Sequence, residues 1–179
     1  MKFIRVTLVL IFAAVAGLPA AAQSPELDQL FLDLQTAEDW EPIEREIITN
    51  FSHSGSDAMD LMLERGWDAI NVGDYRKAVE HLSALIDHAP DFAEGYNARA
   101  TAFYLMGEPG LSIDDIREVL VRNPRHFGAL TGLGFIYEEM GNLEGAYAAF
   151  KAAQALHPHL PNVNDSLARL APEVGGVDL

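Results

Sequence analysis

The chain of 179 residues contains no cysteine. This absence excludes disulfide bonds, thiolate metal ligands, a thiol nucleophile and the acylated cysteine that anchors bacterial lipoproteins. Val, Ile and Thr nowhere alternate with polar residues at a period of two, so no β-sheet is expected. Basic residues are scarce, with 12 Lys and Arg against 27 Asp and Glu. A net charge of −15 argues against binding to nucleic acids and anionic membranes, whose phosphates would repel the chain.

Motifs of catalysis are also missing. The segment Gly132–Gly134 lies in a predicted helix and lacks both a third glycine and a preceding strand, so it is not a phosphate loop. The segment Ser52–Ser54 places serine beside His53, but no carboxylate is expected to orient that histidine. Glu138 and Glu139 are adjacent on a predicted helix and point about 100° apart, so they cannot form a facing acid pair. We therefore expect no enzyme activity and no cofactor.

Residues 1–22 form a segment of their own. Lys2 and Arg5 precede an uncharged apolar run over residues 6–18, and three alanines follow at residues 20–22. The apolar run of about 13 residues is shorter than the about 20 that a membrane span needs. The pattern predicts a cleaved signal peptide, with an uncleaved anchor as the alternative. Removal leaves 10 basic against 27 acidic residues, and an acidic, cysteine-free exported chain fits a bacterial periplasm.

A repeat governs the rest of the sequence. Comparison at a shift of about 34 residues aligns three consecutive frames, 59–92, 93–126 and 127–160. Eight positions agree in size or type in all three frames. They are Met62, Tyr96 and Leu130; Gly66, Ala100 and Gly134; Ala69, Phe103 and Tyr137; Gly73, Gly107 and Gly141; Ala78, Ser112 and Ala146; Leu82, Ile116 and Phe150; Leu85, Val119 and Ala153; and Pro90, Pro124 and Pro158.

Each frame predicts two antiparallel helices joined by a tight turn. Small residues such as Gly66 and Gly134 let the second helix cross closely, and the registered glycines end each first helix in a left-handed conformation. Asp74 and Asn142 are expected to cap the second helices, which the registered prolines end. The second frame has Glu108, Pro109 and Gly110 at its turn, where proline is tolerated in a first helical turn.

This pattern resembles the tetratricopeptide repeat family. The resemblance implies an all-α, right-handed superhelical solenoid with repeats at 59–92, 93–126 and 127–160. Another class of helical repeat is the alternative. We further expect a capping helix over residues 161–171, in which Leu167 and Ala168 cover the third repeat, and a disordered tail over residues 172–179.

The N-terminal extension, residues 23–58, does not follow the repeat. Leu27, Leu30, Phe31 and Leu34 share one helical face, and a second predicted helix carries Ile43, Ile47, Ile48 and Phe51 on one side. We expect this helical pair to cover the open end of the first repeat, because a solenoid end must be covered. The alternative is a segment that docks a partner or a second copy of the chain.

The family resemblance also implies a function. In similar proteins the first helix of every repeat lines a concave groove that holds a segment of a partner protein. The chain is then a non-catalytic adaptor of the cell envelope. The residues that this places in the groove are Leu63, Trp67, Asn71, Glu94, Asn97, Thr101, Tyr104, Thr131, Phe135, Glu138 and Glu139.

The composition of these positions predicts the kind of partner. They include no Lys or Arg, so recognition of acidic chaperone tails, which some family members achieve with a basic clamp, is not expected. Aromatic anchors beside acids favour a neutral to basic segment. Trp67 could instead pack against the N-terminal helices. A carrier of small ligands or metal is the alternative function, and His126, His157 and His159 could approach one loop edge, although no metal site is expected.

Overall fold

The computed structural model describes residues 24–175, so the expected signal peptide lies outside the described residues. Over this range the structure has nine α-helices and no strand, which confirms the predicted all-α class. The helices are α1 (Pro25–Leu34), α2 (Glu41–Phe51), α3 (Asp57–Asn71), α4 (Tyr75–His88), α5 (Ala93–Leu105), α6 (Pro109–Arg122), α7 (Phe127–Glu139), α8 (Leu143–Leu156) and α9 (Pro161–Val174).

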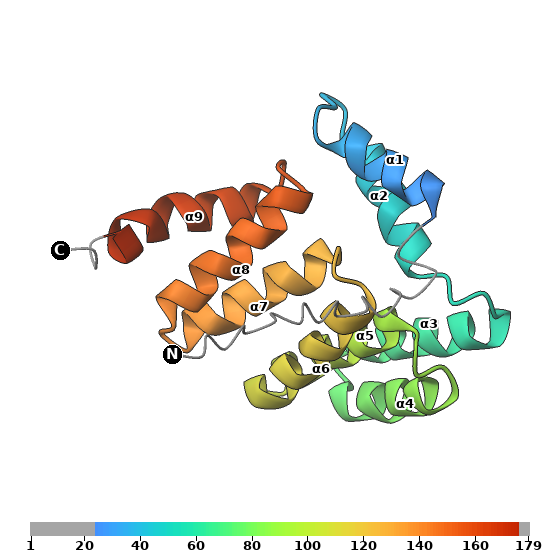
Figure 1. The fold of residues 1–179 in the computed structure, drawn as a ribbon. Helices are drawn as coiled ribbons and strands as arrows, with labels where there is room; N and C mark the ends of the chain where they lie inside the picture. Colours follow the sequence, from blue (N-terminus) through green and yellow to red (C-terminus); the bar gives the residue numbers. More distant parts are fainter. Residues whose placement is uncertain (1–23, 176–179) are drawn as a thin grey trace, which may run out of the picture.

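Helices α3 to α8 form three antiparallel pairs that stack along one direction (Figure 1). The turn of each pair contains a registered glycine with a positive φ, 78° at Gly73, 78° at Gly107 and 76° at Gly141. Asp74 then accepts a hydrogen bond from the Lys77 amide at 3.2 Å, as a capping residue should. The predicted turn chemistry is confirmed. In the second pair, Pro109 occupies the first turn of α6 without shortening it.

Small residues set how closely the two helices of a pair approach. A Cβ placed on Gly66 would lie 2.4 Å from the Leu82 side chain, and one on Gly134 would lie 2.4 Å from Phe150. Leu82 and Phe150 are themselves fully buried. The recurrence of small residues at these positions therefore reflects a steric limit, because each large side chain fills the space that the glycine leaves.

The third repeat is covered by α9. Val163, Leu167 and Leu170 are buried against Phe150 and its neighbours. Ala168 is exposed, so the expectation that it covers the repeat is wrong; it lies between the buried positions of the helix and faces away from them.

The expected end of this helix at residue 171 is also wrong. Helix α9 continues to Val174, although Pro172 lies inside its last turn. A proline so near the end removes one backbone hydrogen bond and leaves few turns to interrupt, and the Gly175 amide still bonds to the Ala171 carbonyl. Residues 172–174 are thus helical, and residues 176–179 lie outside the described range.

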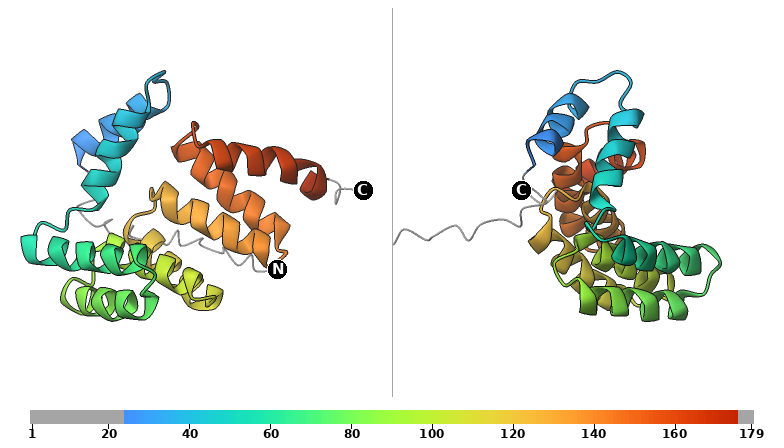
Figure 2. Two further views of the ribbon diagram at one scale, coloured as in Figure 1. Left: turned by 180° about the vertical axis from the view of Figure 1, so that it is seen from behind. Right: turned by 90° about the vertical axis from the view of Figure 1, so that its right-hand side faces the viewer.

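The N-terminal pair does not cover the first repeat. Figures 1 and 2 show α1 and α2 beside the turn that joins α8 to α9. The apolar side chains of the pair find a buried partner in Phe127, at the start of α7, so the expected covering of the first repeat is wrong. The residues of this cluster are Leu27, Leu30, Phe31, Leu34, Trp40, Ile43, Ile47, Phe51, Phe127, Leu156 and Leu160.

Candidate functional site

A hollow of about 250 Å³ lies between the first helices of the second and third repeats, α5 and α7. Its walls are mostly apolar, with the rings of Tyr104 and Phe135 on opposite helices. Four of the eleven residues predicted for the groove line it: Asn97, Thr101, Tyr104 and Phe135. The full lining is Asn97, Ala100, Thr101, Tyr104, Ser112, Gly128, Ala129, Gly132, Phe135 and Ile136.

Two glycines open the α7 side of this hollow. Gly128 and Gly132 are one helical turn apart and both line it. A Cβ on Gly132 would meet only the Ile116 side chain, at 3.9 Å, so no packing inside the fold forbids a larger residue there. The Phe135 ring is held edge-on against Phe150, with centroids 5.0 Å apart. The hollow therefore combines a fixed aromatic wall with an accessible stretch of helix backbone.

The acids at the C-terminal end of α7 are already engaged. The Tyr104 hydroxyl donates to Glu139 Oε1 at 2.5 Å, and this carboxylate raises the pKa of Tyr104. Glu138 pairs with Arg169, which reaches back from the exposed side of α9. The sequence pattern does not bring Arg169 near the groove, because Arg169 and Glu138 meet only through the packing of α9. Of these two acids, Glu138 has a cationic partner, and Glu139 has none among the described residues.

Glu94 is part of the internal structure. Its side chain is buried and accepts hydrogen bonds from His126 Nε2 at 2.9 Å and from the side-chain amide of Asn97 at 3.1 Å. The other ring nitrogen of His126, Nδ1, accepts from the Ala129 backbone amide at 3.0 Å and so caps α7. Glu94 therefore joins the second repeat to the third, and both of its carboxylate oxygens accept hydrogen bonds inside the fold.

The remaining predicted residues lie outside the hollow. Leu63 is buried in the core of the first repeat, and Trp67 packs half-buried against that core rather than against the N-terminal helices. Asn71 is exposed at the end of α3, and the Thr131 hydroxyl donates to the Phe127 carbonyl within α7. The structure thus confines the candidate site to the second and third repeats.

Helix α2 closes one end of the groove, a contact that the sequence pattern does not predict. A second hollow of about 150 Å³ shares Asn97 and Gly128 with the first and is bounded by Ile48 and Phe51 of α2. The spacing of Ile48 and Phe51 identified an apolar helix face but carried no information about which surface that face meets. Only the packing of α1 and α2 on the third repeat brings these residues to the groove.

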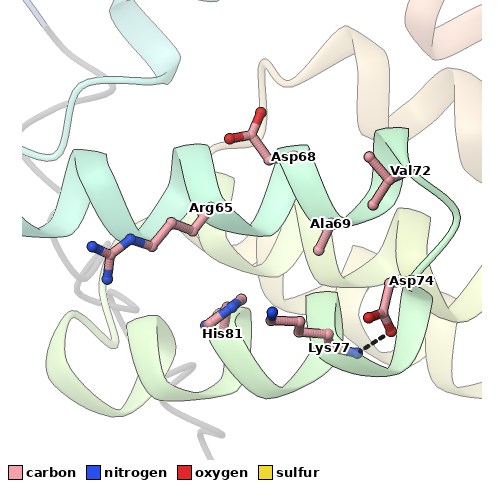
Figure 3. Close-up of a pocket in the computed structure, with 7 residues that line it drawn as sticks. All are labelled: Arg65, Asp68, Ala69, Val72, Asp74, Lys77 and His81. Atoms are coloured by element: carbon pink, nitrogen blue, oxygen red, sulfur yellow. Dashed lines mark hydrogen bonds between the residues drawn. The ribbon is translucent and has the colours of Figure 1, made fainter.

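A larger hollow, of about 470 Å³, lies elsewhere (Figure 3). It sits between α3 and α4 at the end of the first repeat that the N-terminal pair leaves uncovered. Cationic and acidic side chains line it together, and Asp74 there caps α4. The lining residues are Arg65, Asp68, Ala69, Val72, Asp74, Lys77 and His81.

The segment Ser52–Ser54 does have a carboxylate beside it, contrary to expectation. Asp60 Oδ2 lies 3.1 Å from His53 Nδ1, and Asp60 Oδ1 accepts from the Ser54 hydroxyl at 2.6 Å. Partial burial raises the pKa of Asp60, but the bonds from Ser54 and His53 outweigh it and lower the pKa below the ordinary value. Both groups bond to Asp60 and not to each other, so the arrangement closes the turn into α3 and forms no nucleophile–base pair.

Residues 24–175 contain neither a candidate metal site nor a candidate membrane span. No group of three or more His, Asp or Glu side chains in this range is placed to hold a metal ion. The three histidines near the α6–α7 and α8–α9 turns instead pack with aromatic rings: His126 against Phe51, His157 against Phe127, and His159 against Trp40. In the same range, no helix has the length and apolar character needed to cross a membrane.

Comparison with known sequences identifies the family. The sequence profile of the tetratricopeptide repeat matches residues 63–114 and 97–161. The chain belongs to the tetratricopeptide repeat (TPR) family. A TPR repeat-containing protein of Rhizobium etli is 33% identical over 161 residues, which cover 87% of this chain and 79% of that protein.

Solved TPR structures share the fold. The type III secretion chaperone SycD of Yersinia enterocolitica, in complex with a peptide of the translocator YopD, superposes with a TM-score of 0.62. The match is 17% identical and covers 66% of this chain and 95% of that one. The TPR2B domain of yeast Sti1, solved as its pHsp70 complex, gives a TM-score of 0.60 at 18% identity, over 66% of this chain and 99% of that one. At these identities the likeness shows the fold alone.

Proposed function

We propose that the hollow between α5 and α7 binds a segment of a partner protein. TPR domains generally mediate interactions between proteins and are not catalytic modules, and the two similar solved structures are complexes of this kind. The observation that carries the proposal is the hollow itself. Aromatic rings from two repeats line it, together with an α7 backbone stretch that Gly128 and Gly132 leave accessible.

The size of the hollow favours a protein segment over a small ligand. Pockets for small molecules usually enclose about 300–1,000 Å³. A hollow of about 250 Å³ lies just below that range and suits one or two side chains of a chain that continues beyond it. Apolar side chains would fill the space between Tyr104 and Phe135, and Asn97 offers polar contacts at the rim.

The charge of the site favours a neutral to basic segment. Glu139 carries no cationic partner among the described side chains, whereas Glu138 is paired with Arg169. The whole chain carries −15, so a basic partner would also be steered toward it. Of the acids that the sequence predicted for this role, Glu139 has the strongest support and Glu94 the least, because Glu94 is buried.

We place this adaptor in the bacterial cell envelope, most simply in the periplasm. The support is the sequence of residues 1–22, with two positive charges, an apolar run too short for a membrane span, and three alanines. The absence of cysteine and the acidity of the remaining chain agree with that location.

Filling the hollow tests the proposal. Gly132→Phe places a ring into it, and Gly110→Phe is a matched control, because a Cβ on Gly110 of α6 meets nothing within 4 Å. Tagged chains with each change are used to capture proteins from an extract of the source cells. We expect Gly132→Phe to lose a partner that wild type and Gly110→Phe both retain. Equal capture by all three chains would show that the partner binds elsewhere.

A further inference from the structure

The end of the groove that α2 closes has the properties of an occupied binding site. The Phe51 ring stacks on His126 with centroids 4.9 Å apart and lies 6.2 Å from the Phe127 ring. Ile48 stands three residues earlier on the same helix, is 45% exposed, and lines the same small hollow. An aliphatic and an aromatic side chain from one helix face thus rest on the N-terminal ends of α5 and α7.

Helix α2 is held there by apolar and ring-stacking contacts, without a side-chain hydrogen bond to the repeats in the described range. Over the described residues, no side chain of α2 donates or accepts a hydrogen bond to a repeat. Glu44 comes closest, with Oε1 at 3.4 Å from His157 Nε2, but the geometry is not that of a hydrogen bond. The polar contacts of the pair come from α1 and its following turn. Asp28 pairs with Arg125 at 2.6 Å, and Gln35 donates to the Leu156 carbonyl at 2.9 Å.

Helix α2 shares a buried apolar cluster with α1, but within residues 24–175 its side chains make no hydrogen bond to the repeats, whereas α1 does. Apolar contacts are non-directional and can be replaced by any helix face of similar shape. The ion pair and the hydrogen bond of α1 and its following turn are directional and require Arg125 and the Leu156 carbonyl. The hollow that Phe51 borders adjoins the one between α5 and α7, because Asn97 and Gly128 line both. A longer apolar face would therefore bury more of the groove than α2 does.

We propose that α2 is an internal, displaceable occupant of the groove, and that the natural partner is an amphipathic helix that replaces it. That helix carries an aliphatic and an aromatic residue three positions apart, as Ile48 and Phe51 are in α2, and adds an apolar residue for the hollow between α5 and α7. The inference rests on the proposed function and adds the class of partner and its regulation. Tethering gives α2 an effective concentration of about millimolar, so only a partner that binds better displaces it.

A peptide copy of α2 tests the displacement. The probe is a fluorescein-labelled synthetic peptide of residues 41–54, added to the full chain and followed by fluorescence anisotropy. Phe51→Ala in the full chain weakens its own α2, so we expect it to bind the probe at least about tenfold more tightly than wild type does. Leu32→Ala is the control, because Leu32 is a 64% exposed apolar residue of α1 that does not border either groove hollow. This variant should bind like wild type.

The probe's own Phe51→Ala form should bind the Phe51→Ala chain at least about tenfold more weakly. Equal affinity of the probe for wild type and the Phe51→Ala chain would overturn the proposal, as would equal binding of the two probes. If either of these results is found but Gly132→Phe still abolishes partner capture, the groove function stands and the displacement of α2 is wrong. If the probe displaces α2 but Gly132→Phe leaves capture unchanged, the displacement stands and the groove function is wrong.

A distance measurement gives an independent readout. Since the chain has no cysteine, spin labels can be attached at Thr49→Cys on α2 and Ala152→Cys on α8, both exposed positions. Double electron–electron resonance on the spin-labelled, otherwise wild-type chain should show one narrow distribution of label-to-label distances. This distribution should broaden and shift to longer distances as the unlabelled probe is added. An unchanged distance at probe concentrations that saturate binding would mean that α2 stays in place.

Discussion

Gly66 and Gly134 differ from the other helical glycines in what lies opposite them. A methyl group on either would lie 2.4 Å from a fully buried Leu82 or Phe150 side chain. We expect Gly66→Ala and Gly134→Ala each to lower the free energy of unfolding by about 1–3 kcal/mol, the usual cost of overpacking. Gly110→Ala meets no atom and should raise it by up to about 1 kcal/mol, since alanine favours the helix. Urea denaturation measures all three; a stabilising change at Gly66 or Gly134 would contradict the steric limit.

His157 makes the stability of the fold depend on pH. It is fully buried between Trp40 and Phe127 and next to Glu44 and His159. Burial above all, together with His159, lowers the pKa of His157 from 6.5 to about 4. The folded state therefore binds this proton less readily than the unfolded chain does. The resulting stability is fully present above about pH 6.5 and is lost progressively as the pH falls toward 4.

We expect the contribution of His157 to the free energy of unfolding to fall by up to about 3 kcal/mol between about pH 6.5 and pH 4. His157→Phe keeps an aromatic ring and removes the titration, so its unfolding free energy should fall less steeply from pH 7 to pH 4. Glu44, whose pKa is raised by burial, acts in the opposite sense and is common to both chains. Comparing the two pH series therefore isolates His157. Parallel curves for wild type and His157→Phe would contradict the assignment.

Among the elements, α9 carries the clearest stability role. Leu170 is 1% exposed and packs against Phe150 and its neighbours. Leu170→Ala should cost about 2–4 kcal/mol of unfolding free energy, because truncation leaves a cavity at the last interface of the solenoid. Ala168→Ser on the exposed side of the same helix should change it by less than about 0.5 kcal/mol. Equal denaturation midpoints for the two variants would remove the capping role.

We propose that residues 1–22 direct the chain to the cell envelope. Its charge, its short apolar run and its alanines predict cleavage between Ala22 and Gln23. The intact mass of the protein recovered from the cell envelope should correspond to a chain that begins at Gln23. A protein that retains residues 1–22 and stays with the membrane fraction would identify the segment as an anchor.

At the scale of the molecule, the repeats were predictable and their long-range contacts were not. Each repeat is specified locally, since Gly73 ends a helix and Asp74 caps the next within a few residues. The apolar face of the N-terminal helical pair could also be predicted from the sequence. The surface that this face covers could not, because Phe127 lies almost 100 residues from α1 and no local sequence feature shows that it needs covering.

The same limit applied to the site. Asn97, Thr101, Tyr104 and Phe135, predicted for the groove face, line one hollow, because the repeat register fixes which helix face each occupies. The engagement of Glu94 by His126 depends on how neighbouring repeats stack, which a single-sequence pattern does not encode.

The central claim is that a partner segment lies in the hollow between α5 and α7. A photo-crosslinking residue at Thr101, which lines that hollow, tests it most directly, with Val121 on α6 as a control that is 70% exposed and outside the lining. Irradiation in living cells followed by mass spectrometry should yield a partner segment joined at position 101 and none at 121. Adding Gly132→Phe should abolish the adduct. A partner that joins at 121, or that joins at 101 despite Gly132→Phe, would contradict the account.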